Sequence, residues 1–197
     1  MKVAVNTGLV SRRLDFDWKV NIVHDDDDRN AFVVPGGGLF IYTGLLKFLD
    51  NNAELMGVVA HEIAYADSEL LIENLIDRFE GSNLRDVVDR KDMSIVEDIA
   101  EYFQTIRYNE GAVIHADTFA INLLCPFNYD PTGLKDLIIR ADTTDAVNDF
   151  KWLTAKNYDV PNRVTLIDEV LERNDCARGS NVLLKAQYER FIEEYLP

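Results

Sequence analysis

The sequence is short of the residues that build common metal and disulfide sites. It contains three histidines, His24, His61 and His115, and two cysteines, Cys125 and Cys176. Because no C-x-x-C pair is present, a metal site must recruit carboxylates or remain incomplete. Two cysteines also cannot form a disulfide framework, and the sequence leaves open whether they form one bridge or stay as two buried thiols.

Basic charge and long apolar runs are scarce as well. The 35 acidic and 20 basic side chains give a formal net charge of −15, which predicts that neither nucleic acid nor an anionic membrane is a partner. No apolar run approaches the ~20 residues that span a bilayer. The apolar part of residues 1–6 is too short for a secretory signal. Hydrophobic residues make up 47% of the 197 residues, which predicts a single globular domain over residues 1–197.

Alternating apolar residues predict β structure over residues 17–43, with strands at 18–23, 31–34 and 39–42. Between the first two lies an acidic run, Asp25–Asp28, which we expect to be a solvated hairpin turn. It lacks the spaced ligands and the glycine of a calcium-binding loop. The following break, Pro35–Gly38, has no lysine and no helix after it, so we expect backbone freedom rather than phosphate binding.

From Thr43 onward the periodicity is helical. A short helix contains Leu45 and Leu49, and Asn51 with Glu54 forms a predicted capping box for a helix that continues through Leu70. Further helices are predicted over 94–107, 112–124, 132–140, 143–155, 161–173 and 180–195, with a loop and a partial helix over 79–92. The expected fold class is α+β: a largely helical domain with a small N-terminal antiparallel β-sheet.

The second predicted helix carries most of a zinc motif. In H-E-x-x-H, two histidines four residues apart share one helix face and bind Zn²⁺, and the glutamate acts on the metal-bound water. Here His61 and Glu62 are present, but Tyr65 stands in place of the second histidine. Taken alone, this pattern is weak, because a single histidine on an apolar helix face is usually a packed core residue.

The motifs on either side of this pattern indicate how it should be interpreted. They occur in a fixed order along the chain: 30–37 (NAFVVPGG), 42–46 (YTGLL), 53–55 (AEL), 57–64 (GVVAHEIA), 116–117 (AD), 129–131 (YDP) and 161–163 (PNR). This ordered set resembles the HtpX/BepA-like family of zinc metallopeptidases, which are gluzincins, and above all their soluble bacterial lipoprotein branch. The resemblance covers roughly residues 17–170 and implies the gluzincin fold and the cell envelope or periplasm.

The resemblance also implies roles for individual residues. His61 matches the first zinc ligand and Glu62 the general base, which would be vestigial if zinc is not bound. The second ligand position is occupied by Tyr65, and the third falls four residues before Asp117, at Val113. Asp117 and Arg163 match positions outside the coordination shell of the metal, whose side chains orient the zinc ligands. Pro35, Gly36 and Gly37 match the strand edge on which an extended peptide pairs.

Two of the three zinc ligands are therefore replaced, and an accessory histidine is missing from the segment 153–156 (LTAK). Zinc is not expected at normal affinity, because one ligand forms no chelate. An alternative ligand set, His61 with Glu110 and Tyr65, is conceivable. His115 lies about 200° around the helix from Val113, so we expect it to point away.

Two functions follow as hypotheses. One is a catalytically impaired pseudopeptidase that keeps a cleft for a polypeptide segment or protein partner. The other is an active zinc metalloendopeptidase with non-standard ligands. A gene product without a retained role is also open. In the simplest structural interpretation, Asp117 hydrogen-bonds His61 or Tyr65, and Arg163 pairs with a buried carboxylate and holds the C-terminal helices. Trp18 and Trp152 are expected in the core.

Overall fold

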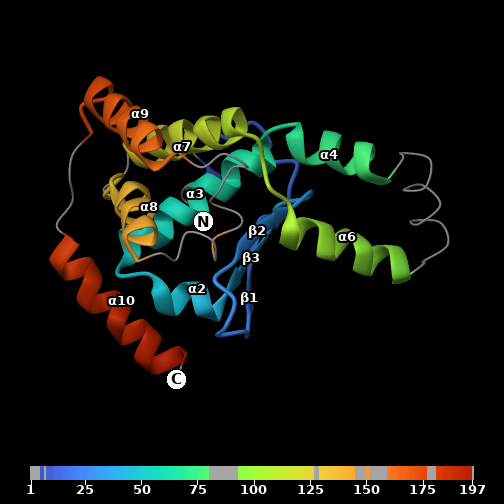
Figure 1. Ribbon diagram of the computed structural model, residues 1–197, viewed down its shortest axis with the longest axis horizontal. Coiled ribbons are helices and arrows are strands. Elements are labelled where there is room, and N and C mark those ends of the chain that lie inside the picture. The colour runs from blue at the N-terminus through green and yellow to red at the C-terminus, as the bar shows by residue number, and fades with distance from the viewer. Residues whose placement is uncertain are drawn as a thin grey trace.

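The structure is a computed structural model that describes residues 5–6, 8–79, 93–126, 129–144, 150, 159–176 and 181–196. Over these residues, helices pack against a small sheet formed near the N-terminus (Figure 1). The predicted α+β class is confirmed. Among the described helices, none has the length and apolar character that crossing a membrane requires.

The sheet has three strands, β1 (Lys19–Val23), β2 (Ala31–Val34) and β3 (Gly38–Tyr42), in the order β1-β3-β2. β2 and β3 pair antiparallel, whereas β1 and β3 pair parallel. The sheet is therefore mixed, and the prediction of an antiparallel sheet is wrong for β1. Alternation of apolar residues shows that a segment is a strand, but it carries no information about the direction of its neighbour.

The acidic segment Asp25–Asp28 connects β1 to β2, which are not neighbours, so the predicted hairpin turn is wrong. The segment passes the start of α2 (Thr43–Phe48), where the Gly44 N–H donates to the Asp25 carbonyl at 2.9 Å. A Cβ at Gly44 would lie 2.5 Å from the Asp26 carbonyl oxygen. Only glycine allows α2 to begin this close to the connection.

The tight turn of the sheet is instead formed by the proline and glycines after β2. The Gly37 N–H donates to the Val34 carbonyl at 3.2 Å, and Gly36 has a φ of 97°. Proline in the second position and glycine with positive φ in the third are the residues that a type II turn favours. Pro35 and Gly36 therefore set the register between β2 and β3.

The remaining helices follow the sequence periodicity closely. They are α3 (Asn52–Asp67), α4 (Leu70–Phe79), α6 (Met93–Thr105), α7 (Glu110–Leu124), α8 (Gly133–Thr143), α9 (Val160–Arg173) and α10 (Asn181–Tyr195). One difference is that the helix predicted through Leu70 is two helices, because Ser68 adopts extended geometry and its hydroxyl donates to the Tyr65 carbonyl. The predictions for 80–92, Trp152 and most of 143–155 fall outside the described residues.

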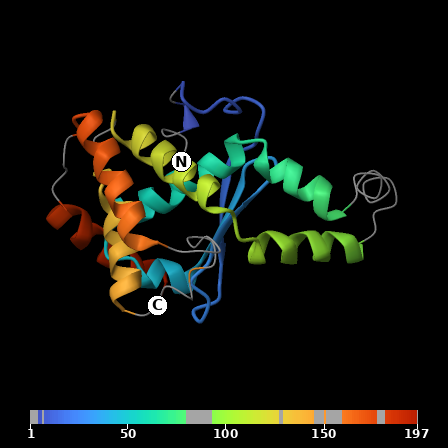
Figure 2. The same ribbon diagram turned by 45° about the horizontal axis from the view of Figure 1, so that its top comes forward.

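α3 is the central helix of the molecule, and it contacts the sheet as well as α7, α8 and α10 (Figure 2). Its start is capped by Asn51, whose side chain accepts from the N–H groups of Ala53 and Glu54. A Cβ at Gly57 would lie 2.8–2.9 Å from Leu134 in α8, and one at Gly133 would lie 2.2 Å from the Ala53 backbone. These two glycines let α3 and α8 touch along their backbones, so most of α3 is buried.

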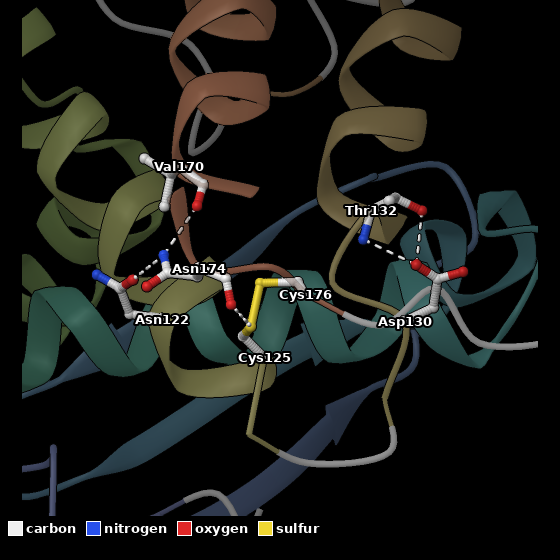
Figure 3. The surroundings of a disulfide bond; sticks show 7 residues. All are labelled: Asn122, Cys125, Asp130, Thr132, Val170, Asn174 and Cys176. Carbon is white, nitrogen blue, oxygen red and sulfur yellow. Dashed lines mark hydrogen bonds between the residues drawn. A yellow bond between two sulfur atoms is a disulfide. The ribbon is translucent and has the colours of Figure 1, made fainter. Parts of the chain in front are cut away.

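A disulfide joins Cys125, just after α7, to Cys176, just after α9 (Figure 3). Next to it, the Asn174 side chain donates to the Val170 carbonyl at 2.8 Å and to Asn122 Oδ1 at 2.9 Å. Of the two states that the sequence left open for these cysteines, the structure has the bridge. It fastens the ends of two helices that also share the site described next.

Candidate functional site: a buried polar cluster

Four polar side chains meet inside the protein where α3, α7 and α9 pack together. They are His61, Glu62, Asp117 and Arg163, which we call the His61 cluster. Their side chains are inaccessible: His61 is 0% exposed, Glu62 2%, and Asp117 and Arg163 3% each. Since a buried charge costs free energy unless it is paired, the pairings within this cluster determine its chemistry.

The strongest pairing joins Asp117 of α7 to Arg163 of α9. Arg163 Nε donates to Asp117 Oδ2 at 2.8 Å, and Nη2 donates to Oδ1 at 2.7 Å. This is the two-pronged geometry in which guanidinium and carboxylate match. Burial alone would raise the pKa of Asp117, but Arg163 and His61 lower it below its usual value. The predicted pairing of Arg163 with a buried carboxylate is present, and it ties α9 to α7.

His61 lies between two carboxylates. Its Nε2 is 3.4 Å from Asp117 Oδ1, and its Nδ1 is 3.7 Å from Glu62 Oε1. Burial favours the neutral ring and so lowers the pKa of His61, but the two carboxylates outweigh burial and the net direction is upward. The pKa of Glu62 is raised by its burial, although His61 and the Val33 N–H oppose the shift. Glu62 is thus turned toward His61 and the backbone of β2.

Tyr65 lies one turn after His61 on α3 and is held between two rings. Its ring meets His61 edge-on, with centroids 5.0 Å apart, and stacks on Tyr108 with centroids 3.7 Å apart. Burial raises the pKa of Tyr65 well above 10, so its phenol stays protonated. Among the described residues, no group forms a hydrogen bond with its hydroxyl oxygen.

Val113 lies on α7 one turn before Asp117, which is the spacing expected of the third ligand position. Its side chain is 1% exposed and belongs to the hydrophobic core. An isopropyl group has no lone pair, so this position supplies no ligand.

The residues of the alternative ligand set do not come together. Glu110 is exposed in the first turn of α7, whereas His61 and Tyr65 are buried. His115 is exposed, as expected from its place on the helix. Within the described ranges, no three side chains among histidine, cysteine, aspartate and glutamate are placed to hold a metal ion.

The residues present do not fit a zinc ion. A catalytic zinc site takes three protein ligands and keeps one position open. Here His61 is the one donor left at the three positions, since Tyr65 is a protonated phenol and Val113 is apolar. Asp117 cannot substitute for the missing ligands, because both of its oxygens accept from Arg163.

The segment predicted as a peptide-binding edge lies in the turn between β2 and β3. Pro35 and Gly36 are the central turn residues, and the Gly37 carbonyl accepts from the Lys19 N–H at 3.1 Å. β3 is the middle strand, so the edges of the sheet are β1 and β2. On β2, the Val33 N–H is directed at Glu62.

Tyr108 is a member of this region that sequence reasoning missed. It lies two residues before α7, is 6% exposed, and covers Tyr65 by ring stacking. Nothing in the local pattern marks it, because it stands in the short connection between α6 and α7. The segment 153–156, where the accessory histidine is missing, lies outside the described residues.

Part of the chain is similar to known proteins. Residues 2–81 match peptidase family M48. Mitochondrial metalloendopeptidase OMA1 of Arabidopsis thaliana is 28% identical over 115 residues, which is 58% of this chain and 24% of that protein. These matches support a place in the M48 metallopeptidase family.

Other relatives match shorter stretches. OMA1 of Saccharomyces cerevisiae is 37% identical over 59 residues, which is 29% of this chain and 17% of that protein. OMA1 of Bos taurus is 40% identical over 52 residues, which is 26% of this chain and 10% of that protein. The chain thus spans less than a quarter of the length of these relatives.

The bacterial HtpX/BepA-like branch stays a prediction. The M48 match includes His61, Glu62 and Tyr65 but ends before Val113, Asp117 and Arg163.

Proposed function

We propose that this protein is a catalytically impaired member of the M48 family, a pseudopeptidase that binds polypeptide without cutting it. The observation that carries the proposal is the number of metal donors: one of the three ligand positions, His61, can donate to zinc. The other two hold a buried, protonated phenol and a valine.

The charges around His61 support the same proposal. In place of a metal ion, the positive charge beside Asp117 comes from Arg163, which engages both carboxylate oxygens. This arrangement already satisfies Asp117, so binding a cation there would require breaking a buried ion pair. Breaking such a pair is costly, because it leaves an uncompensated charge in the interior.

Glu62 is also poorly placed for catalysis. A general base must come within hydrogen-bond reach of the proton that it removes. Glu62 is 2% exposed, and its neighbours are His61 and the backbone of β2. Its retention fits a structural role that links α3 to the sheet.

The ligand class comes from the relatives. Their names describe them as endopeptidases, and endopeptidases act on polypeptide, so we assign polypeptide as the ligand of this chain. No cofactor is part of the proposal. The disulfide between Cys125 and Cys176 supports a compartment in which disulfides persist, such as the cell envelope.

The proposal is tested by incubating the purified protein with unfolded casein and zinc, with and without a chelator, and following cleavage by gel and mass spectrometry. The matched control is Glu62→Gln, which keeps the size of the side chain and removes the base. The protein and the variant should both leave casein intact while a fluorescent casein peptide binds to both. Chelator-sensitive cleavage by the protein that Glu62→Gln abolishes would show an active zinc metalloendopeptidase and overturn the proposal. If no peptide binds, the part of the proposal that concerns polypeptide binding is wrong.

A further inference from the structure

β1 lies at one edge of the sheet. In the register with β3, the Lys19 N–H donates to the Gly37 carbonyl, so Lys19, Asn21 and Val23 direct their backbone groups at β3. Because alternate residues of a parallel strand face the same neighbour, the N–H and C=O groups of Val20 and Ile22 point outward. Among the described residues, no strand pairs with this side of β1 (Figure 1).

The side chains of the same two residues are apolar and exposed. Val20 is 44% exposed and Ile22 41%, although they stand in register with Leu39 and Ile41, which are buried. Natural edge strands are usually blunted by an outward charge, a proline or a bulge. Neither outward residue of β1 provides one of these protections. The strand therefore offers both unpaired backbone groups and apolar contact to an added strand.

Acidic residues flank β1 at both ends. Between positions 15 and 28 the sequence has six aspartates and a single lysine, Lys19. Asp15 and Asp17 precede the strand, Asp25–Asp28 follow it, and all except Asp28 are exposed. Lys19 pairs with Asp17, and Lys47 of α2 pairs with Asp26 at 2.7 Å. Arg12, Arg13 and Arg29 stand just outside this range, where Arg12 pairs with Glu69 and Arg29 lies over the Phe48 ring. The six aspartates outnumber the two lysines and three arginines together, so the field at the strand is negative and favours a basic partner.

The same charges argue against a second copy of this chain as the occupant. If β1 paired antiparallel with β1 of another copy, Asp15 and Asp17 of one chain would lie beside Asp25–Asp28 of the other. A parallel pair would place the two acidic connections side by side. Like charges brought together across strands are destabilising.

We propose that β1 is a docking strand that adds an extended, basic segment of another polypeptide to the sheet. Backbone hydrogen bonds with Val20 and Ile22 position the added segment along β1. Lysines or arginines on either side of the paired segment form ion pairs with the aspartates. This surface is separate from the His61 cluster, so the proposal stands or falls independently of whether the protein cleaves peptides.

The test uses a fluorescein-labelled peptide in which an alternating threonine–valine core of five residues carries two lysines at each end. Binding to the full chain is followed by fluorescence anisotropy at low salt. One control peptide has glutamates in place of the lysines. The other carries N-methyl groups on alternate amides, which prevents strand pairing along one side. We expect the lysine peptide to bind and both controls to fail.

The variants separate backbone pairing from shape and charge. Val20→Pro removes one outward N–H and should weaken binding about tenfold, the factor that corresponds to one hydrogen bond of about 1.4 kcal/mol. Its matched control, Val20→Thr, keeps the N–H and the branched shape and should bind as the parent does.

Asp25→Asn with Asp27→Asn should weaken binding about fivefold at low salt, as expected for exposed charge pairs. The same loss of charge on α4, in the control variant Glu73→Gln with Asp77→Asn, should leave binding unchanged.

Three results would overturn the proposal. Equal binding of the N-methylated peptide would exclude strand pairing, and it does so even if Val20→Pro fails to fold. Equal binding of the glutamate peptide would exclude charge as the selector. Sedimentation showing a dimer that Val20→Pro dissociates would make a second copy the occupant.

Discussion

Two buried ionic clusters lie on the same helix, α3, and they are built differently. Near its start, Glu54 accepts from Arg140 of α8 and from the Asp50 N–H at 2.8 Å. Two turns later, the His61 cluster gathers a histidine, two carboxylates and an arginine from three helices. We call the first group, Glu54 with Asp50 and Arg140, the Glu54 cluster.

The Glu54 cluster has the features of a structural ion pair at the surface of the core. Arg140 is 23% exposed, donates to the Phe48 carbonyl at 2.8 Å, and lies over the Phe48 ring. Burial still raises the pKa of Glu54, which the Asp50 N–H and Arg140 oppose. Water reaches part of the arginine, so losing a partner leaves a charge that can be partly hydrated.

The His61 cluster has no such access to water. Both partners of its ion pair are buried, and Glu62 approaches His61 only to 3.7 Å. The comparison teaches that the two ion pairs differ in hydration: Arg140 is partly exposed, whereas Asp117 and Arg163 are both buried and depend on each other for charge compensation.

The largest expected effect separates the two clusters directly. Arg163→Met should lower the free energy of unfolding by about 3–5 kcal/mol, because it leaves Asp117 charged and buried. Urea unfolding followed by circular dichroism measures this loss. Adding Asp117→Leu to the same variant should recover most of it, since no unpaired charge then remains. A loss below about 1 kcal/mol for Arg163→Met would contradict the role given to this pair.

The matching change in the Glu54 cluster should cost less. Arg140→Met removes charged hydrogen bonds from a partly hydrated site, so we expect a loss of about 2 kcal/mol in the same unfolding experiment. If Arg140→Met destabilises as much as Arg163→Met, the difference in burial does not separate the clusters.

A smaller effect should appear in the pH dependence of stability. The raised pKa of His61 means that the folded state binds its proton more tightly than the unfolded chain. This stabilisation is complete below about 6.5, the unfolded value, and is lost as pH rises through the folded pKa. The melting temperature should therefore fall more between pH 6 and 8.5 for the parent than for His61→Asn, by about 2–4 °C. Parallel curves would show that His61 does not titrate as described.

Much of the fold followed from local patterns. The cap at Asn51 was predicted correctly, and Glu54 reaches back as a capping box requires, although to the N–H of Asp50 rather than that of Asn51. The ion pair of Arg163 with a buried carboxylate was anticipated. The cap follows from residue spacing at one helix start. The ion pair follows from the rule that a buried arginine needs a carboxylate partner. Both can be inferred from the sequence.

Other features depend on contacts between distant segments. The parallel pairing of β1 arises from a connection that passes α2, and Gly44 gave no sign of this beforehand. The stacking of Tyr108 on Tyr65 and the bridge from Cys125 to Cys176 likewise join residues that no local period relates. Such features follow from how the helices pack, which spacing along the chain does not determine.

The zinc content of the purified protein tests the central claim most directly. After exposure to zinc and removal of excess, mass spectrometry of the metal should find far less than one zinc per chain in the parent. Tyr65→His with Val113→Glu restores the three donors, and about one zinc per chain is expected there, at a site lost in the triple variant with His61→Ala. One zinc per chain on the parent, lost on His61→Ala, would contradict the claim that the metal centre has been dismantled.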